Sequence, residues 1–289
     1  MKIMRHIFII IVLLLLCGQH AFCQQKQGSG QCPDPFYRGA LERKVIDHAS
    51  TRVLYALNAQ DINKMDTYID LSQLQIGKTC AKYCSVFAEE ADNTFQKWWK
   101  EHPNAGASKR DLGMKGRNAS IWSEYQWSAL FFKGDTLTEW ATMPFQIFQH
   151  YRYDEPYPTM KWTLLQETTT ICEHKCQKAT CHWRGRDFIA WFTKDIPVRK
   201  GPWKFGGLPG LILKVYDTNR FYTFEAIGIE KGNFPIYQYP KKMYGKSTRQ
   251  KVWKLQGDLN RDFWKAIGTV NDQGVLVSKP KPYDPLELE

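Results

Sequence analysis

Apolar and polar residues alternate over short runs through the middle of the chain, and turn-forming residues separate these runs. This pattern predicts half-buried strands, because successive side chains of a strand point to opposite faces. The spacers between the runs are too short for parallel crossovers, so we expect antiparallel neighbours. The runs are ASTRVLYAL at 49–57, short apolar pieces within 68–87, and then IWSEYQWSALFF, FQIFQHYRY, WTLLQETTTIC, DFIAWFT, LILKVYD and FYTFEAIGI between 119 and 229.

Two other stretches follow a helical period. Residues 91–101 place aromatic residues at i, i+3 and i+4, and 247–268 carry an apolar stripe at helical spacing. The second stretch begins with a capping box formed by Ser247 and Gln250, and Gly268 is a suitable end. The sequence therefore predicts a mainly β fold, a curved antiparallel sheet or half-barrel with one or two packed helices.

The first 23 residues have the layout of a secretory signal peptide. Lys2 and Arg5 precede an unbroken apolar run over 7–16, which is too short to span a bilayer. We therefore expect an exported chain that is cleaved near residue 23. The alternative is a lipid anchor on one of two cysteines that follow apolar residues, Cys17 or Cys23.

After this peptide, residues 24–45 begin with a polar stretch rich in Gly, Ser and Pro, which predicts a flexible lead-in. Residues 46–289 are then expected to form a single β-rich domain. No later stretch has the roughly 18 consecutive apolar residues of a transmembrane helix, so we do not expect the chain to span a membrane.

The chain is basic, with a formal net charge of +11, and the excess is uneven. Residues 231–257 contain seven Lys or Arg and no Asp or Glu. This stretch is either a solvated basic face or a site for an anionic partner such as lipid headgroups, a polyanionic glycan or an acidic peptide. Nucleic acid is a poor partner for an exported chain.

Six cysteines remain beyond the signal peptide, an even number that suggests up to three disulfides in an oxidising compartment. Sequence cannot choose among the 15 pairings that six cysteines allow. The preferred arrangement pairs the cysteines near residue 80 with the cluster at 172–181 across neighbouring strands. The six candidates are Cys32, Cys80, Cys84, Cys172, Cys176 and Cys181.

The segment 172–182 also gathers three cysteines and two histidines. In an extended strand Cys172, His174 and Cys176 would share one face and could hold a soft metal ion such as Zn²⁺ or Cu⁺. The spacing of these cysteines differs from that of a zinc knuckle, and export favours oxidation, so disulfides are the stronger interpretation. No other cofactor is expected.

The segment GPWKFGGLPGLILKV at 201–215 is rich in glycine, yet it does not fit a phosphate-binding loop. A strand rather than a helix follows its glycines, so no helix N-terminus faces a phosphate. Pro209 and Gly210 suit the two central positions of a type II turn, which predicts a tight corner between strands. The aromatic residues expected to line a ligand pocket beside this corner are Trp191, Trp203 and Phe205.

This corner carries a family resemblance. Its core reads GLPGLI and resembles the signature of the GLPGLI family, as do the flanking segments 176–179, 186–197 and 201–205. The resemblance implies an exported protein of a Gram-negative bacterium, in the periplasm or outer cell envelope. It implies no catalytic residue. The signature residues are Gly207, Leu208, Pro209, Gly210, Leu211 and Ile212.

No hydrolase motif such as G-x-S-x-G or H-E-x-x-H occurs in the chain. The leading hypothesis is a non-enzymatic, exported binding or envelope-associated protein with a small-molecule or envelope partner. A metal-binding or thiol-redox protein that uses the cluster at 172–182 is the alternative, and a hydrolase ranks last.

Overall fold

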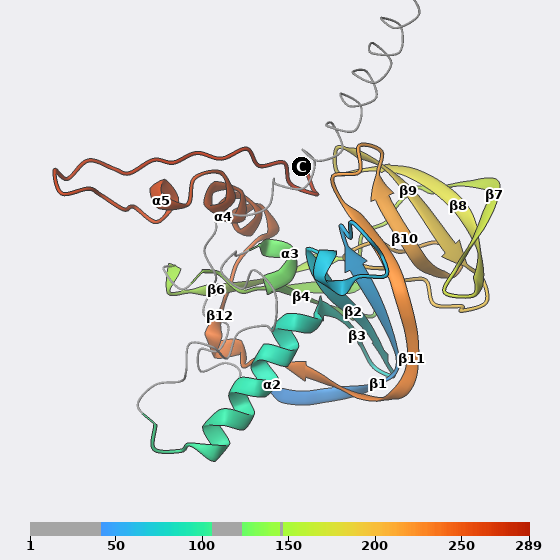
Figure 1. Ribbon diagram of the computed structural model, residues 1–289, viewed down its shortest axis with the longest axis horizontal. Coiled ribbons are helices and arrows are strands. Elements are labelled where there is room, and N and C mark those ends of the chain that lie inside the picture. Colours follow the sequence, from blue (N-terminus) through green and yellow to red (C-terminus); the bar gives the residue numbers. More distant parts are fainter. Residues whose placement is uncertain (1–41, 106–122, 145–146) are drawn as a thin grey trace, which may run out of the picture.

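Twelve strands form one open, curved sheet, and helices lie against it (Figure 1). The computed structural model describes residues 42–105, 123–144 and 147–289. The predicted signal peptide at 1–23, nearly all of the lead-in and Cys32 lie outside these residues. The elements are β1 Lys44–Leu57, η2 Met65–Thr67, β2 Asp70–Gly77, β3 Ala81–Ser85, α2 Val86–Glu101, α3 Glu124–Trp127, β4 Ser128–Lys133, β5 Thr136–Ala141, β6 His150–Pro156, β7 Thr163–Ile171, β8 His174–Trp183, β9 Arg186–Thr193, β10 Leu211–Asp217, β11 Thr223–Gln238, η4 Lys241–Met243, β12 Tyr244–Lys246, α4 Arg249–Arg261 and α5 Phe263–Ala266.

The strand order is β12-β6-β5-β4-β3-β2-β1-β11-β10-β9-β8-β7. Every neighbouring pair is antiparallel except β12 and β6, which run parallel. Short hairpins join five of the eleven neighbouring pairs, which are β2–β3, β4–β5, β7–β8, β8–β9 and β10–β11. The predicted fold class, a curved and mainly antiparallel sheet with packed helices, is therefore confirmed.

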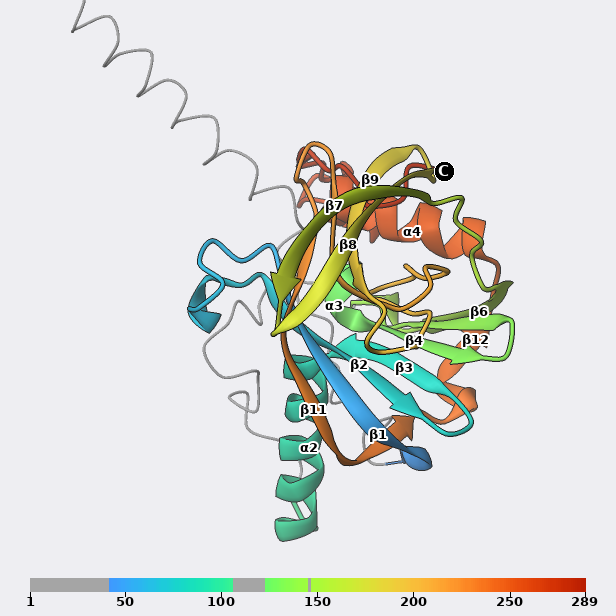
Figure 2. The ribbon, with the colours of Figure 1, turned by 90° about the vertical axis from the view of Figure 1, so that its right-hand side faces the viewer.

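The two long strands β1 and β11 join the halves of the sheet (Figure 2). Their register shifts at three points, between Val45 and Asp47, Ala49 and Thr51, and Leu54 and Tyr55. Each irregularity increases the local twist, so the sheet curls instead of lying flat. The curl brings β4–β6 on one side round to face β9 and β10 on the other.

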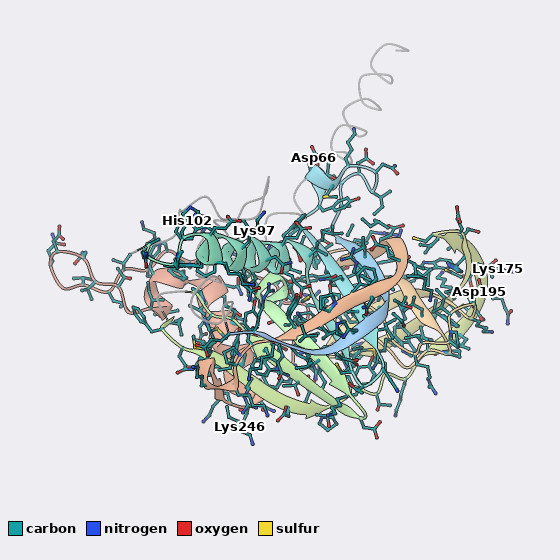
Figure 3. All side chains as sticks on the ribbon, turned by 90° about the horizontal axis from the view of Figure 1, so that it is seen from below. Asp66, Lys97, His102, Lys175, Asp195 and Lys246 are labelled. Atoms are coloured by element: carbon teal, nitrogen blue, oxygen red, sulfur yellow. The ribbon has the colours of Figure 1, made fainter. Side chains whose placement is uncertain are left out.

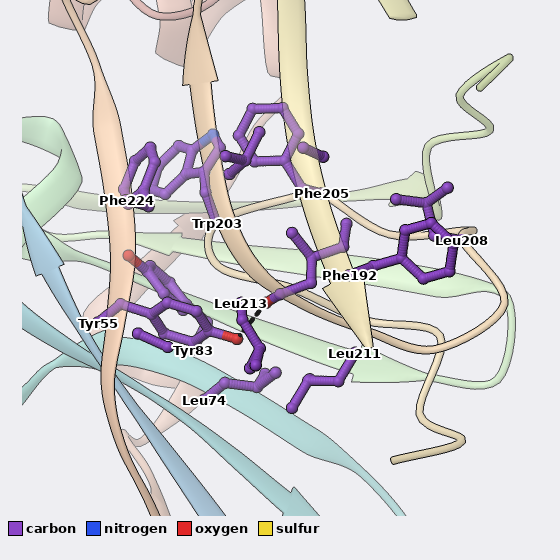
Figure 4. Packing of buried hydrophobic residues seen from close by; sticks show 14 of the residues in the cluster. Tyr55, Leu74, Tyr83, Phe192, Trp203, Phe205, Leu208, Leu211, Leu213 and Phe224 are labelled. Carbon is purple, nitrogen blue, oxygen red and sulfur yellow. Dashed lines mark hydrogen bonds between the residues drawn. The ribbon is translucent and has the colours of Figure 1, made fainter. Parts of the chain in front are cut away.

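Alternating side chains of β1 serve two cores. Val53 and Tyr55 belong to the main core inside the curl, whereas Ala56 belongs to a second core that includes residues of α2 and α4. The Tyr55 hydroxyl donates to the Ile212 carbonyl at 2.8 Å, which ties β1 to the glycine-rich corner. Figure 4 shows this main core, in which Trp203 and other residues of the corner are packed among strand residues.

The predicted helices exist, with different starts. α2 begins earlier than expected, because the Ser85 hydroxyl accepts from the Ala88 amide and caps it. α4 is capped by Thr248 rather than Ser247, and Gly268 follows α5 with a φ of 73°. The run at 121–132 is wrong as a single strand, since Glu124–Trp127 form a helical turn before β4. In the described residues no helix is long and apolar enough to cross a membrane.

Residues 278–289 are irregular, yet part of this tail is buried in the main core. Pro285, Leu286 and Glu287 are buried, and the side chain of Leu286 has no exposed surface. In Figure 1 the chain runs out from α5 and turns back, and the returning leg ends near β9 and β10. An irregular, polar tail that enters a hydrophobic core points to a specific site.

Candidate functional site

The glycine-rich corner between β9 and β10 is closely packed. A Cβ atom on Gly210 would lie 1.9 Å from the Thr193 carbonyl oxygen, and one on Gly206 would lie 1.9 Å from the Tyr157 hydroxyl oxygen. The Gly210 amide donates to the Leu208 carbonyl at 2.8 Å, so a three-residue turn centred on Pro209 forms in place of the expected type II turn. At this corner the backbone at Gly210 packs directly against the backbone at Thr193. This close packing fixes the position of the residues just before the corner.

The three aromatic residues predicted to line one pocket are not brought together. Trp203 and Phe205 are buried inside the curl, and the ring of Phe205 packs against Phe188 at a centroid distance of 4.8 Å. Trp191 is half-buried and alternates with Phe192 along β9, so it faces the other side of that strand. Phe205 fills the core, whereas Trp203 borders a cavity.

Lys204, between these two aromatic residues, is the most unusual side chain of the corner. It is only 2% exposed. Its ammonium lies 2.9 Å from Glu139 Oε2, 3.4 Å from Glu155 Oε1 and 3.0 Å from Glu287 Oε1. It also donates to the Tyr153 hydroxyl at 3.0 Å. A buried ammonium is tolerated because these oxygens replace the water it has lost.

Two arginines complete this cluster. Arg184 contacts Glu155 at 2.6 Å and also pairs with Glu287, while Arg249 donates to Glu287 at 2.8 Å. The cluster thus balances three cations with three carboxylates. We call it the Lys204 centre, and its members are Glu139, Tyr153, Glu155, Arg184, Lys204, Arg249 and Glu287.

Glu287 is held more completely than the other carboxylates. Its Oε1 accepts from Lys204 and, at 2.9 Å, from the indole N–H of Trp203. Its Oε2 accepts from Arg184 and Arg249. Four charged or polar donors converge on one carboxylate in a buried place, which is how proteins recognise an anion.

The charges of the centre are fixed near neutral pH. Burial opposes a charged Glu287, but Lys204, Arg184 and Arg249 outweigh it and hold the pKa of this carboxyl well below its usual range. Burial likewise opposes a charged Lys204, yet the nearby carboxylates raise the pKa of its ammonium well above the ordinary value. Burial raises the pKa of Tyr153 well above the usual value for a phenol.

A cavity of about 60 Å³ lies beside the centre. Trp203, Lys204 and Glu287 line it together with Arg249, Trp253 and Lys254 of α4. Pockets for drug-sized ligands are on the order of 300–1,000 Å³, so this cavity is too small for one while Glu287 is in place. Any larger ligand therefore has to take the position of Glu287.

The basic stretch at 231–257 does not form one face. It spans β11, η4, β12 and α4. Arg249 points inward to the Lys204 centre, Lys254 lines the cavity, and Lys246 lies at the periphery of the molecule (Figure 3). The part of the stretch that meets a buried carboxylate is therefore the start of α4.

The cysteine pairing preferred from the sequence is wrong. Cys84 lies on β3, and Cys80 directly precedes this strand. Five strands separate β3 from β8 in the sheet order. Strand order, which the sequence does not show, keeps these thiols far from the other cluster. Among the described residues the free thiols are Cys80, Cys84, Cys172, Cys176 and Cys181.

The predicted metal site is not formed either. Cys172 lies in the turn between β7 and β8, with a φ of 47°, so it does not share a strand face with Cys176. His174 instead contacts Asp195, which lies at the edge of the molecule (Figure 3), at 3.2 Å. Within the described ranges no three His, Cys, Asp or Glu side chains are placed to hold a metal ion. Burial raises the pKa of Cys176 to about 11, which disfavours a thiolate.

The Lys204 centre could not be recognised in the sequence because its members come from distant parts of the chain. They lie on β5, β6, the β8–β9 turn, the glycine-rich corner, α4 and the tail. One signal was present: Lys204 is a charged residue between two aromatic residues in a segment that otherwise reads as core. A lysine in that position needs a buried anionic partner.

A family model matches this same region. Residues 184–214 match a Porphyromonas/Bacteroidetes family described as "Protein of unknown function (Porph_ging)". The match runs from Arg184 through the glycine-rich corner into β10 and so includes Lys204. No curated protein matches the sequence.

Among solved structures, two crystal forms of PNGF-II are similar, with TM-scores of 0.45 and 0.44 and 11% sequence identity in both. They cover 75% and 73% of this chain but 34% and 33% of their own. The chain thus spans about a third of the length of PNGF-II.

Proposed function

We propose that this chain is an exported, non-enzymatic binding protein that holds a carboxylate-bearing ligand at the Lys204 centre. The proposal rests on the position of Glu287. Four donors surround its carboxylate in the core. The tail delivers this carboxylate, whereas the other members lie on the sheet, the corner and α4. Without Glu287 the centre would keep three cations and two carboxylates, an excess of positive charge that attracts an anion.

The fixed charges favour binding over catalysis. A general acid or base works best with a pKa near the operating pH. Lys204 and Tyr153 have pKa values well above that range, and Glu287 has one well below it. Groups whose protonation state does not change near neutral pH are suited to bind charged ligands rather than to transfer protons.

The compartment and the family are part of the proposal. The apolar N-terminal run and its basic start support export to the periplasm or outer cell envelope of a Gram-negative bacterium. The match at 184–214 covers the GLPGLI signature, which supports membership of the GLPGLI family. An acidic peptide is one of the anionic partners that the basic stretch suggested, and Arg249 of that stretch would contact it.

A chemical rescue experiment tests the binding proposal on the full chain. Glu287→Ala removes the carboxylate and leaves Lys204 and the two arginines without it, so we expect a loss of about 3–5 kcal/mol in the free energy of unfolding. Added acetate should restore part of this loss. A Kd near 10 mM would return about 1.4 kcal/mol at about 100 mM acetate. Urea denaturation followed by tryptophan fluorescence measures both effects.

Acetamide is the matched probe, because it has nearly the shape of acetate but no charge. Glu289→Ala is the matched variant, since its side chain is exposed in the same tail. The proposal fails if acetate stabilises the Glu287→Ala chain no more than acetamide does, or if acetate stabilises the Glu289→Ala chain equally.

A further inference from the structure

The tail reaches the Lys204 centre as an irregular segment with a bend at Leu286, and each residue from Asp284 to Glu289 makes at least one backbone hydrogen bond. The Tyr222 hydroxyl donates to the Asp284 carbonyl at 2.5 Å, and Arg186 donates to the Pro285 carbonyl at 2.6 and 3.0 Å. The Leu286 amide donates to the Tyr125 hydroxyl at 2.7 Å. Such backbone contacts hold a peptide whatever its side chains are.

The contacts continue past Glu287. The Trp253 indole donates to the Glu287 carbonyl at 2.9 Å, and the Leu288 amide donates to the Arg184 carbonyl at 3.0 Å. Arg249 donates to the Glu289 carbonyl. We call the surface that makes these contacts the tail groove, and its residues are Tyr125, Arg184, Arg186, Trp203, Lys204, Tyr222, Arg249 and Trp253.

Three side chains of the tail give the groove its selectivity. Asp284 pairs with Arg186 at 2.7 Å, and the Leu286 side chain is fully buried in the main core. Glu287 enters the Lys204 centre. Pro285 fixes its own φ and holds Asp284 in an extended conformation, which lowers the entropy lost on docking. The groove thus selects an acidic side chain, an apolar side chain two positions later, and a second acidic side chain directly after that.

The tail can leave without breaking the sheet. The last strand ends at Lys246, and the tail is reached through an exposed hairpin over 269–277. In Figure 1 this hairpin projects away from the body of the molecule. A cavity of about 720 Å³ lies between the end of α4, α5 and the returning residues 278–283. The returning leg is attached at separate points: Ser278 and the Lys279 amide bind Asp262, and the Lys281 amide donates to the Arg261 carbonyl at 2.7 Å.

We infer that the tail groove is a binding site for an acidic peptide of a partner protein, with the pattern acid–x–apolar–acid, and that residues 283–289 occupy it in cis. This inference rests on the proposed function and names its ligand. The cations Arg186, Lys204 and Arg249 supply the charge complementarity, and the small cavity beside Glu287 leaves no room for a larger ligand while the tail is in place.

Competition between the tail and a peptide added in trans tests the inference. The probe is a labelled peptide with the sequence of residues 281–289, KPYDPLELE, added to the full chain. Its apparent affinity scales with the fraction of empty groove, so it should bind the Glu287→Gln chain at least about tenfold more tightly than the wild-type chain. Fluorescence anisotropy measures the binding.

The same substitution acts in opposite directions in the two molecules. Glu287→Gln in the peptide should abolish binding, while Glu287→Gln in the chain strengthens it. Glu289→Gln in the chain should leave the affinity unchanged. If Glu287→Gln does not fold, Asp284→Asn weakens the partly exposed contact with Arg186 and should have a smaller effect of the same sign.

Three results would overturn the inference. They are equal binding of the peptide to the Glu287→Gln and wild-type chains, equal binding of a scrambled peptide, and a concentration-dependent dimer of the wild-type chain that Glu287→Gln dissociates. The dimer would assign the groove to the tail of a second copy. Acetate rescue of Glu287→Ala without peptide binding would reject the inference and retain the proposed function.

Discussion

Replacing Lys204 by Met should lower the free energy of unfolding by about 3–5 kcal/mol, a large part of the total for a typical domain. The substitution keeps the volume and the apolar stem of the side chain but removes its charge. Glu139, Glu155 and Glu287 would then share a site from which water is excluded, with two arginines left to compensate them. Urea denaturation followed by tryptophan fluorescence measures the loss.

Lys246→Met is the matched control, because Lys246 is exposed on β12, and it should change stability by less than about 0.5 kcal/mol. The loss should also depend on pH. In the wild-type chain the pKa of Glu287 is depressed, so the stability it contributes is present above about pH 4.5 and is lost below it. In the Lys204→Met chain the carboxyls bind protons more readily, so the deficit should be smaller at pH 5 than at pH 8. A small, pH-independent loss would contradict this account of the centre.

Gly210→Ala should lower the free energy of unfolding by about 2–5 kcal/mol, from the combined cost of backbone strain and overpacking. The added Cβ would lie 1.9 Å from the Thr193 carbonyl oxygen and 3.2 Å from the Lys194 Cα, and Gly210 has a φ of 155°. The opposing atoms are backbone, so the clash can be relieved only by moving β9 away from β10. That movement would also shift Lys204, which the corner positions.

Gly274→Ala is the comparison that separates the clash from the conformation. Gly274 also has a positive φ, of 73°, but a Cβ there would meet nothing within 4 Å. Its substitution should cost about 1–2 kcal/mol. Both losses are measured by the same urea denaturation. Equal losses at the two glycines would contradict the prediction that the backbone clash adds to the cost of Gly210→Ala.

The sequence predicted the elements better than their arrangement. Alternation identified most strands of the middle of the chain, but β5 and β8 were not among the predicted runs. Pro209 and Gly210 identified a tight corner. The segment Glu124–Trp127 has the same apolar and aromatic composition as a strand, so its helical turn could not be recognised from local pattern. The start of α2 was placed five residues too late and the cap of α4 one residue too early, since several neighbouring residues could serve.

Properties that depend on strand order could not be predicted. The pairing of Cys80 or Cys84 with the second cluster was plausible in sequence, yet five strands separate β3 from β8. The same holds for the Lys204 centre, where curling of the sheet brings Glu139 close to Lys204. The tail has few apolar residues, so its local pattern does not indicate that Leu286 and Glu287 are buried. The tail is buried because Lys204, Arg184 and Arg249 bind the carboxylate of Glu287.

Native-state hydrogen exchange of the full chain tests most directly whether the tail groove holds an exchangeable peptide. The Leu286 and Leu288 amides donate to Tyr125 and Arg184, and the Leu211 and Ile212 amides donate to carbonyls within the corner. Local opening of the tail predicts that the amides of Leu286 and Leu288 exchange at least about tenfold faster than those of Leu211 and Ile212. If all four amides exchange at the rate of global unfolding, the tail is a fixed part of the core and the groove is not a binding site.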